Sequence, residues 1–156
     1  MKLTALQDQL TGDWVGKSTL WCNWLPEPEK ETSSESRLSV KTVARGKFLS
    51  FAYTWSLAGN NHEGFLLTGN ENDSETTSGA WGDSWHQSGS LLVLKGSVAE
   101  AGAIELNGTF EAPPDPDWGW RITITQPTPQ ELQMMMYVIP WNGTPERAVQ
   151  ADYVRA

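Results

Sequence analysis

The sequence contains very few residues of the kinds that form disulfides or bind metals. Among its 156 residues there is one cysteine, Cys22, and there are two histidines, His62 and His86. A single cysteine excludes an internal disulfide and is typical of a reducing compartment. We expect it to be a small buried hydrophobic residue. The two histidines lack the spacing of a known metal motif, so no metal site is predicted.

Long hydrophobic runs are missing as well. No segment approaches the roughly 20 apolar residues that a transmembrane helix needs. The first eight residues, MKLTALQD, lack the apolar stretch of a secretory signal. The sequence therefore predicts a cytoplasmic protein, unless a signal has been removed from the chain.

Positive charge is scarce. Lysine and arginine number 11 against 19 aspartates and glutamates, giving a formal net charge of −8. No lysine or arginine cluster interrupts this negative balance. Phosphate backbones and anionic membrane surfaces repel such a chain. Neither nucleic acid nor a membrane is a predicted partner.

What the chain does have is a series of short strand patterns after one helix. Leu3, Leu6 and Leu10 recur at helical spacing over residues 3–10, and Gly12 is well placed to end that helix. Apolar and polar residues then alternate with the period of a strand. The predicted strands cover residues 12–25, 36–44, 47–57, 62–69, 76–86, 90–96, 103–111, 118–126, 131–140 and 147–155.

About ten short strands at near-regular spacing predict an all-β fold in a single domain, residues 1–156. The expected architecture is a closed antiparallel up-and-down β-barrel of the lipocalin-like kind. Asn107-Gly108 and Asn142-Gly143 are predicted turns, and residues 113–116 (PPDP) are a predicted loop. Residues 26–36 are predicted to be a surface loop, either a solvated connection or a lid over the barrel mouth.

The start of the first strand carries a family resemblance. Gly12-Asp13-Trp14, after a short helix, resembles the glycine-x-tryptophan signature of lipocalins and the wider calycins. That resemblance implies that Trp14 closes the barrel base and packs against a late arginine, with Arg155 the first candidate and Arg121 the second. A guanidinium can stack on an indole while its N–H groups satisfy strand-end carbonyls.

Two further segments resemble an uncharacterised bacterial family of unknown function within the calycins. They are residues 81–86 (WGDSWH) and 115–122 (DPDWGWRI), and residues 134–137 (MMMY) and 148–153 (AVQADY) are also similar. The resemblance spans nearly the whole chain and implies a fold but no activity. Haem-binding relatives with a small calycin barrel use a histidine near the C-terminus. This chain has none there, so no cofactor is expected.

The chain is rich in tryptophan, with nine residues. Three interpretations are open: a core packed with indoles, a ligand cavity lined by aromatic rings, or an exposed stacking platform for sugars. In the second interpretation the predicted binding residues divide into apolar walls and polar anchors. The walls would be Trp24, Tyr53, Trp55, Trp85, Trp120 and Met136, and the anchors Asp83, Arg121 and Tyr137.

Asp83 lies between Trp81 and Trp85 on one predicted strand face. A buried carboxylate needs a partner, and Arg121 or Tyr137 is the expected one. Such a pair could hold a ligand head group or form a sealed core network.

The segment 83–86 also contains the residue types of a hydrolytic triad, but alternation along a strand would place Ser84 and His86 on the face opposite Asp83. No catalytic residue is therefore predicted. The sequence favours a protein that binds a small, largely apolar ligand inside an aromatic-lined barrel. Two alternatives stay open: an enzyme that uses an Asp or His of the cavity as acid–base, and a packed structural module that forms homodimers.

Overall fold

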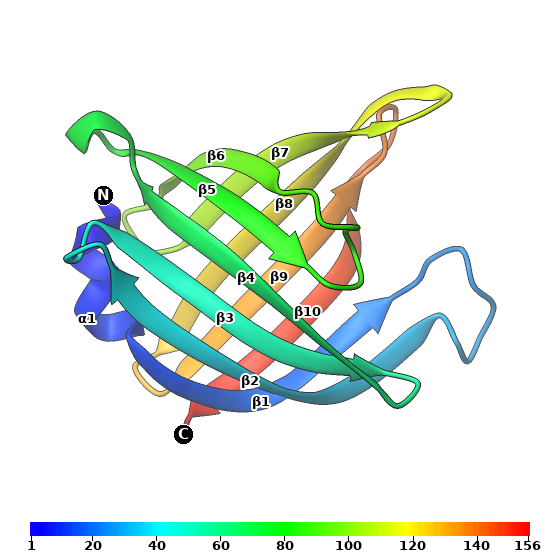
Figure 1. Ribbon diagram of the computed structural model, residues 1–156, viewed down its shortest axis with the longest axis horizontal. Helices are drawn as coiled ribbons and strands as arrows, with labels where there is room; N and C mark the ends of the chain where they lie inside the picture. The colour runs from blue at the N-terminus through cyan, green and yellow to red at the C-terminus, as the bar shows by residue number, and fades with distance from the viewer.

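The chain folds into a closed barrel of ten antiparallel strands. The computed structural model describes residues 1–156, apart from the side chain of Asp73. Each strand pairs with its neighbours in the sequence, and β1 pairs with β10 to close the barrel (Figure 1). The predicted up-and-down barrel is confirmed. The strands are β1 Gly12–Trp21, β2 Glu31–Val43, β3 Phe48–Leu57, β4 Asn60–Asn70, β5 Thr76–Asp83, β6 Leu92–Val98, β7 Ile104–Ala112, β8 Asp115–Thr128, β9 Glu131–Ile139 and β10 Glu146–Arg155.

The short N-terminal helix covers one end of the barrel (Figure 1). A 3-10 turn, η1 (Leu3–Leu6), leads into α1 (Gln7–Leu10), and a second 3-10 turn, η2 (Glu71–Asp73), follows β4. Leu3, Leu6 and Leu10 are buried, and the Leu3 N–H donates to Asn70 Oδ1 at 2.9 Å. No helix among the described residues is both long enough and apolar enough to cross a membrane.

Trp14 and Arg155 meet at this same end. The Arg155 guanidinium carbon lies 4.2 Å from the centre of the Trp14 ring, which is 1% exposed. The Trp14 indole N–H donates to the Leu10 carbonyl at 3.1 Å. Arg155 donates to the carbonyls of Thr11, Pro129 and Gln9. The predicted contact is present, and it ties the last strand to the N-terminal helix.

Inward and outward side chains alternate along the strands, as a barrel requires. In β3, for example, Leu49, Phe51, Tyr53 and Trp55 are buried, whereas Ala52 and Thr54 are exposed. Cys22 follows β1 and is 4% exposed, so its predicted burial is confirmed. Burial raises the pKa of its thiol.

The predicted surface loop over residues 26–36 is wrong in its second half. Strand β2 begins at Glu31, because residues 31–36 pair with β1. Alternating Ser, Thr and Glu residues hid this strand, since they show no apolar face. Ser36 nevertheless points inward and shares a 2.8 Å hydrogen bond with the Tyr153 hydroxyl.

One predicted turn is also wrong. Asn107-Gly108 lies inside β7, where Gly108 serves close packing: a Cβ there would stand 2.6 Å from the Val93 carbonyl oxygen. Asn142-Gly143 does lie in the connection between β9 and β10, as predicted. The predicted loop at residues 113–116 is shorter than expected, because β8 begins at Asp115 and pairs with Ala112.

Candidate ligand-binding site

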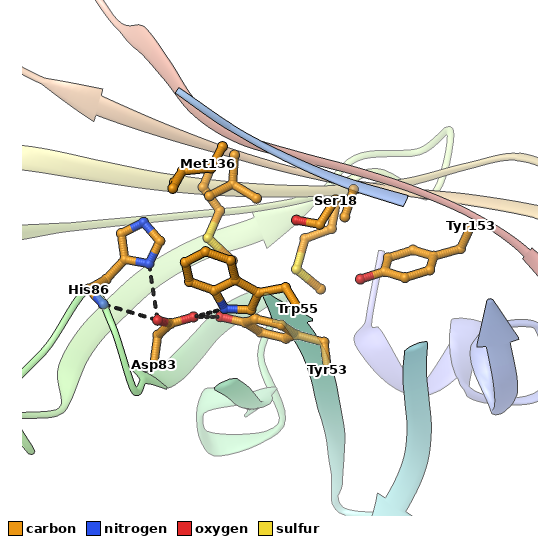
Figure 2. Close-up of a pocket in the computed structure, with 11 residues that line it drawn as sticks. Ser18, Tyr53, Trp55, Asp83, His86, Met136 and Tyr153 are labelled. Atoms are coloured by element: carbon orange, nitrogen blue, oxygen red, sulfur yellow. Dashed lines mark hydrogen bonds and ion pairs between the residues drawn. The ribbon is translucent and has the colours of Figure 1, made fainter. Parts of the chain in front are cut away.

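A buried carboxylate lies inside the barrel at the end of β5. Asp83 is 7% exposed, and its Oδ2 accepts hydrogen bonds from the Tyr53 hydroxyl at 2.8 Å and the Trp55 indole N–H at 3.2 Å (Figure 2). The Tyr53 hydroxyl in turn accepts from the Trp81 indole N–H at 2.9 Å. Gly64, which pairs with Asp83 across β4 and β5, leaves room for Tyr53: a Cβ there would lie 2.2 Å from the hydroxyl oxygen.

The second carboxylate oxygen holds the turn that follows β5. Asp83 Oδ1 accepts from the backbone N–H groups of Trp85 and His86 at 2.9 and 3.0 Å. The same oxygen lies 3.1 Å from His86 Nδ1. The predicted strand over residues 76–86 is therefore too long: it ends at Asp83, and strand alternation does not apply to His86. The turn brings the imidazole back over the carboxylate.

These contacts determine the charge of the site. Burial acts to raise the pKa of Asp83, but the hydrogen bonds and charge interaction with His86, together with the backbone N–H groups, outweigh it and bring the pKa to about 2. Burial, reinforced by the Asp83 charge, raises the pKa of Tyr53 well above its ordinary value. At neutral pH the centre is a carboxylate whose oxygens are both occupied by protein donors.

The predicted partners of Asp83, Arg121 and Tyr137, are the wrong ones. They are cross-strand neighbours on β8 and β9 and alternate with the buried residues Ile122 and Met136, so they face the outside of the barrel. Arg121 Nε donates to Asn107 Oδ1 at 3.0 Å on that outer surface. The spacing of residues within one strand does not show which side chains from other strands meet Asp83 inside the barrel.

The interior beyond Asp83 is almost completely filled. Its remaining cavity has a volume of about 10 Å³ and is lined by Tyr53, Trp55, Met136 and Tyr153, among others (Figure 2). A cavity of that size holds about one water molecule. The barrel centre has no room for a larger molecule in this structure.

Larger hollows lie at the open end of the barrel, opposite α1. Two of them, with volumes of about 570 Å³ and 320 Å³, are both lined by His86 and Trp120. Trp85 and Trp118 also line the larger one, together with Trp24 from the connection between β1 and β2, which is 72% exposed. We call these two hollows together the mouth site.

His86 stands at the centre of the aromatic residues between the interior and the mouth. Its ring centre lies 4.8 Å from that of Trp85, 5.5 Å from that of Trp120, 5.6 Å from that of Trp81 and 5.8 Å from that of Trp55. Trp81 and Trp120 stack on each other at 4.8 Å with an interplanar angle of 13°. The mouth site is thus floored by flat, apolar rings around one imidazole.

The mouth region also contains polar atoms that the fold leaves unsatisfied. Among the described residues, three buried side-chain polar atoms have no hydrogen-bond partner: Gln87 Oε1, Trp118 Nε1 and Trp120 Nε1. All three residues line the mouth site. A buried donor or acceptor without a hydrogen-bond partner lowers the stability of the fold by about 1–3 kcal/mol. Such atoms are therefore uncommon in protein interiors.

Ser84 takes no part in this centre. Its Oγ lies 3.1 Å from His62 Nδ1 and accepts from the Glu63 N–H, and its side chain is exposed. The described residues bring no group of three metal-ligating side chains together.

The predicted binding residues therefore fall into three places. Tyr53, Trp55 and Met136 line the small interior cavity, with Asp83 beside them, whereas Trp24, Trp85 and Trp120 line the mouth. Arg121 and Tyr137 lie outside. The predicted binding set left out His86 and Trp118, and His86 was considered only as a hydrolytic or acid–base group. The signal for His86 was the Asp-x-x-His spacing followed by Ser88-Gly89, which is typical of a turn that an aspartate caps.

Comparison with known proteins identifies the family. The family described as "Protein of unknown function (DUF1579)" matches residues 4–155. The chain belongs to this family. No curated protein matches the sequence.

Two solved structures are similar to this DUF1579 barrel. Rv2717c from M. tuberculosis has a TM-score of 0.66 at 15% identity, with 97% of each chain covered. The S-type phycobiliprotein lyase CPES from Guillardia theta has a TM-score of 0.64 at 13% identity, covering 100% of this chain and 93% of that one. At these identities the likeness shows the fold alone.

Proposed function

We propose that this protein binds a small, largely apolar molecule at the mouth site. One observation carries the proposal: two hollows of about 570 and 320 Å³ meet at His86 and Trp120, and both have aromatic walls. Apolar pockets with a few polar groups are the usual form of small-molecule sites. We also propose that the chain forms a single domain and belongs to the calycin superfamily. In this proposal Trp24, Trp85 and Trp120 contact the ligand.

Four of the other predicted binding residues act indirectly in this proposal. Tyr53 and Trp55 occupy one Asp83 oxygen, and Asp83 orients His86 with the other. Met136 fills the interior below them. The ligand therefore rests on this layer instead of passing through it, and Arg121 and Tyr137 have no direct contact with it.

Naphthalene is a suitable neutral probe for this proposal. We expect it to quench tryptophan fluorescence and to raise the melting temperature, since a ligand that binds only the folded state stabilises it. Trp85→Ala with Trp120→Ala should abolish both effects. Trp141→Ala is the matched control, because Trp141 is 52% exposed and lies in the connection between β9 and β10. Equal responses in the wild type and the double variant would contradict the proposal.

A second candidate is an enzyme that uses His86 as acid–base. The observation that favours it is the 3.1 Å contact between His86 Nδ1 and Asp83 Oδ1, since a carboxylate on one ring nitrogen orients the other for proton transfer. One barrel of this fold is a phycobiliprotein lyase. Hydrolysis of 4-nitrophenyl acetate tests it: His86→Phe should remove the catalysed rate and His62→Phe should not. Equal rates in both variants would exclude His86 as the catalytic group for that ester.

A further inference from the structure

One ring nitrogen of His86, a residue that lines the mouth site, is left without a protein hydrogen-bond partner among the described residues. Its Nδ1 is engaged by Asp83, and Figure 2 shows the other nitrogen pointing away from the carboxylate. No protein partner for Nε2 exists among the described residues, yet it is not one of the buried unpartnered atoms. The side chain is 12% exposed and lines both mouth hollows. The imidazole is therefore within reach of a ligand in the mouth.

The hydrogen-bond network determines what this nitrogen can do. The Asp83 carboxylate has no proton to give, so Nδ1 carries the hydrogen that joins them. In a neutral imidazole with the proton on Nδ1, Nε2 is an acceptor. A ligand bound to this neutral form should therefore supply a donor, an O–H or N–H group, at this position.

The surroundings of Nε2 limit the shape and charge of such a ligand. Trp85 and Trp120 border the imidazole on the mouth side, and their rings favour a flat aromatic partner. The Asp83 carboxylate lies one hydrogen bond behind His86, and the chain carries a net charge of −8. Both disfavour an anion.

We propose that the mouth site recognises a neutral planar aromatic molecule that carries a hydroxyl or N–H group, and that this group donates a hydrogen bond to His86 Nε2. The inference rests on the proposed function and names its ligand class. Aromatic walls alone would accept any flat apolar ring. The imidazole adds a preference for the phenol class over its methylated or unsubstituted counterparts.

Three probes of one ring shape separate the hydrogen bond from apolar contact: naphthalene, 2-methoxynaphthalene and 2-naphthol. Titration calorimetry at neutral pH measures the affinity of each. We expect the wild type to bind 2-naphthol about 3- to 10-fold more tightly than 2-methoxynaphthalene, which is the effect of one net hydrogen bond. In His86→Phe this preference should disappear, while naphthalene still binds.

His62→Phe is the matched control, because His62 is the other histidine and lines neither mouth hollow. It should keep the full preference for 2-naphthol. The wild-type comparison needs no variant, so a poorly folded His86→Phe would not prevent the test.

Two results would overturn the inference and leave the proposed function standing: equal affinity of the wild type for 2-naphthol and 2-methoxynaphthalene, or an undiminished preference in His86→Phe. If none of the three probes bound, the proposed function itself would fail.

Discussion

The two ends of the barrel are built differently, and the difference indicates where function lies. At the closed end, the Trp14 indole N–H donates a hydrogen bond to the Leu10 carbonyl, and the Arg155 guanidinium donates to three backbone carbonyls. At the open end, Trp118, Trp120 and Gln87 hold buried polar atoms without partners. Satisfied polar groups at one end and unsatisfied ones at the other are expected when the first end serves stability and the second serves binding.

The largest effect should come from removing an indole at the closed end. Trp14→Ala should lower the free energy of unfolding by about 3–5 kcal/mol, because Trp14 is almost fully buried beneath Arg155. The same change at the mouth, Trp85→Ala, should cost less than about half as much, since Trp85 is only partly buried. Urea denaturation of both variants measures the difference. Equal losses would remove the distinction between the two ends.

Asp83→Asn should have the next largest effect. It removes the charge that accepts hydrogen bonds from Tyr53, Trp55 and His86, and hydrogen bonds to a charged group contribute about 1.5–3 kcal/mol. We expect a loss of about 2 kcal/mol in thermal or urea unfolding. Asp13→Asn is the control, because Asp13 is exposed on β1 and should change little. If Asp83→Asn left the free energy of unfolding unchanged, the stability of the buried network would not depend on the Asp83 charge.

Acid should remove the same contribution progressively. The pKa of Asp83 is about 2 in the fold against 3.8 in its ordinary state, so its charge stabilises the fold above pH 4 and ceases to do so as the pH falls through about 2. The shift corresponds to about 2 kcal/mol. The stability difference between the wild type and Asp83→Asn should therefore narrow below pH 4, when unfolding is followed from pH 6 to pH 2. A difference independent of pH would contradict the ionised state assigned to Asp83.

The smallest effect on stability should come from Trp118→Phe. This change removes an unpartnered N–H and keeps an aromatic ring, so stability should change by less than about 1 kcal/mol or rise slightly. Trp14→Phe, which removes a bonded N–H, should be clearly destabilising by comparison. A large loss in Trp118→Phe would show that the mouth packs as tightly as the base.

The closed end could be predicted from sequence because a short motif there carries a family resemblance. Gly12-Asp13-Trp14 after a short helix resembles the calycin signature, and that resemblance implies a late arginine against Trp14, with Arg155 the first candidate. The ten strands were also predictable, since inward residues alternate with outward ones along each. Residues 31–36 were not predicted as a strand because they have no apolar face. They are a strand because their backbone pairs with β1 in the barrel.

The open end could be predicted only in part because its geometry depends on one turn. Three of the predicted wall residues, Trp24, Trp85 and Trp120, do line the mouth. The role of His86 depends on the chain leaving the strand at Asp83, and periodicity continued that strand to residue 86. Arg121 and Tyr137 were assigned to Asp83 by chemical type, but strand parity places both outside.

The nine tryptophans provide the most direct test of the central claim, that ligand binds at the open end. Each indole N–H gives its own signal in a ¹⁵N-correlated NMR spectrum, and single Trp→Phe variants assign the signals. On addition of 2-naphthol, the signals of Trp85, Trp118 and Trp120 should shift, while that of Trp14 at the closed end stays in place. Shifts confined to Trp14, or no shift at Trp85 and Trp120 while binding is measurable, would contradict the account.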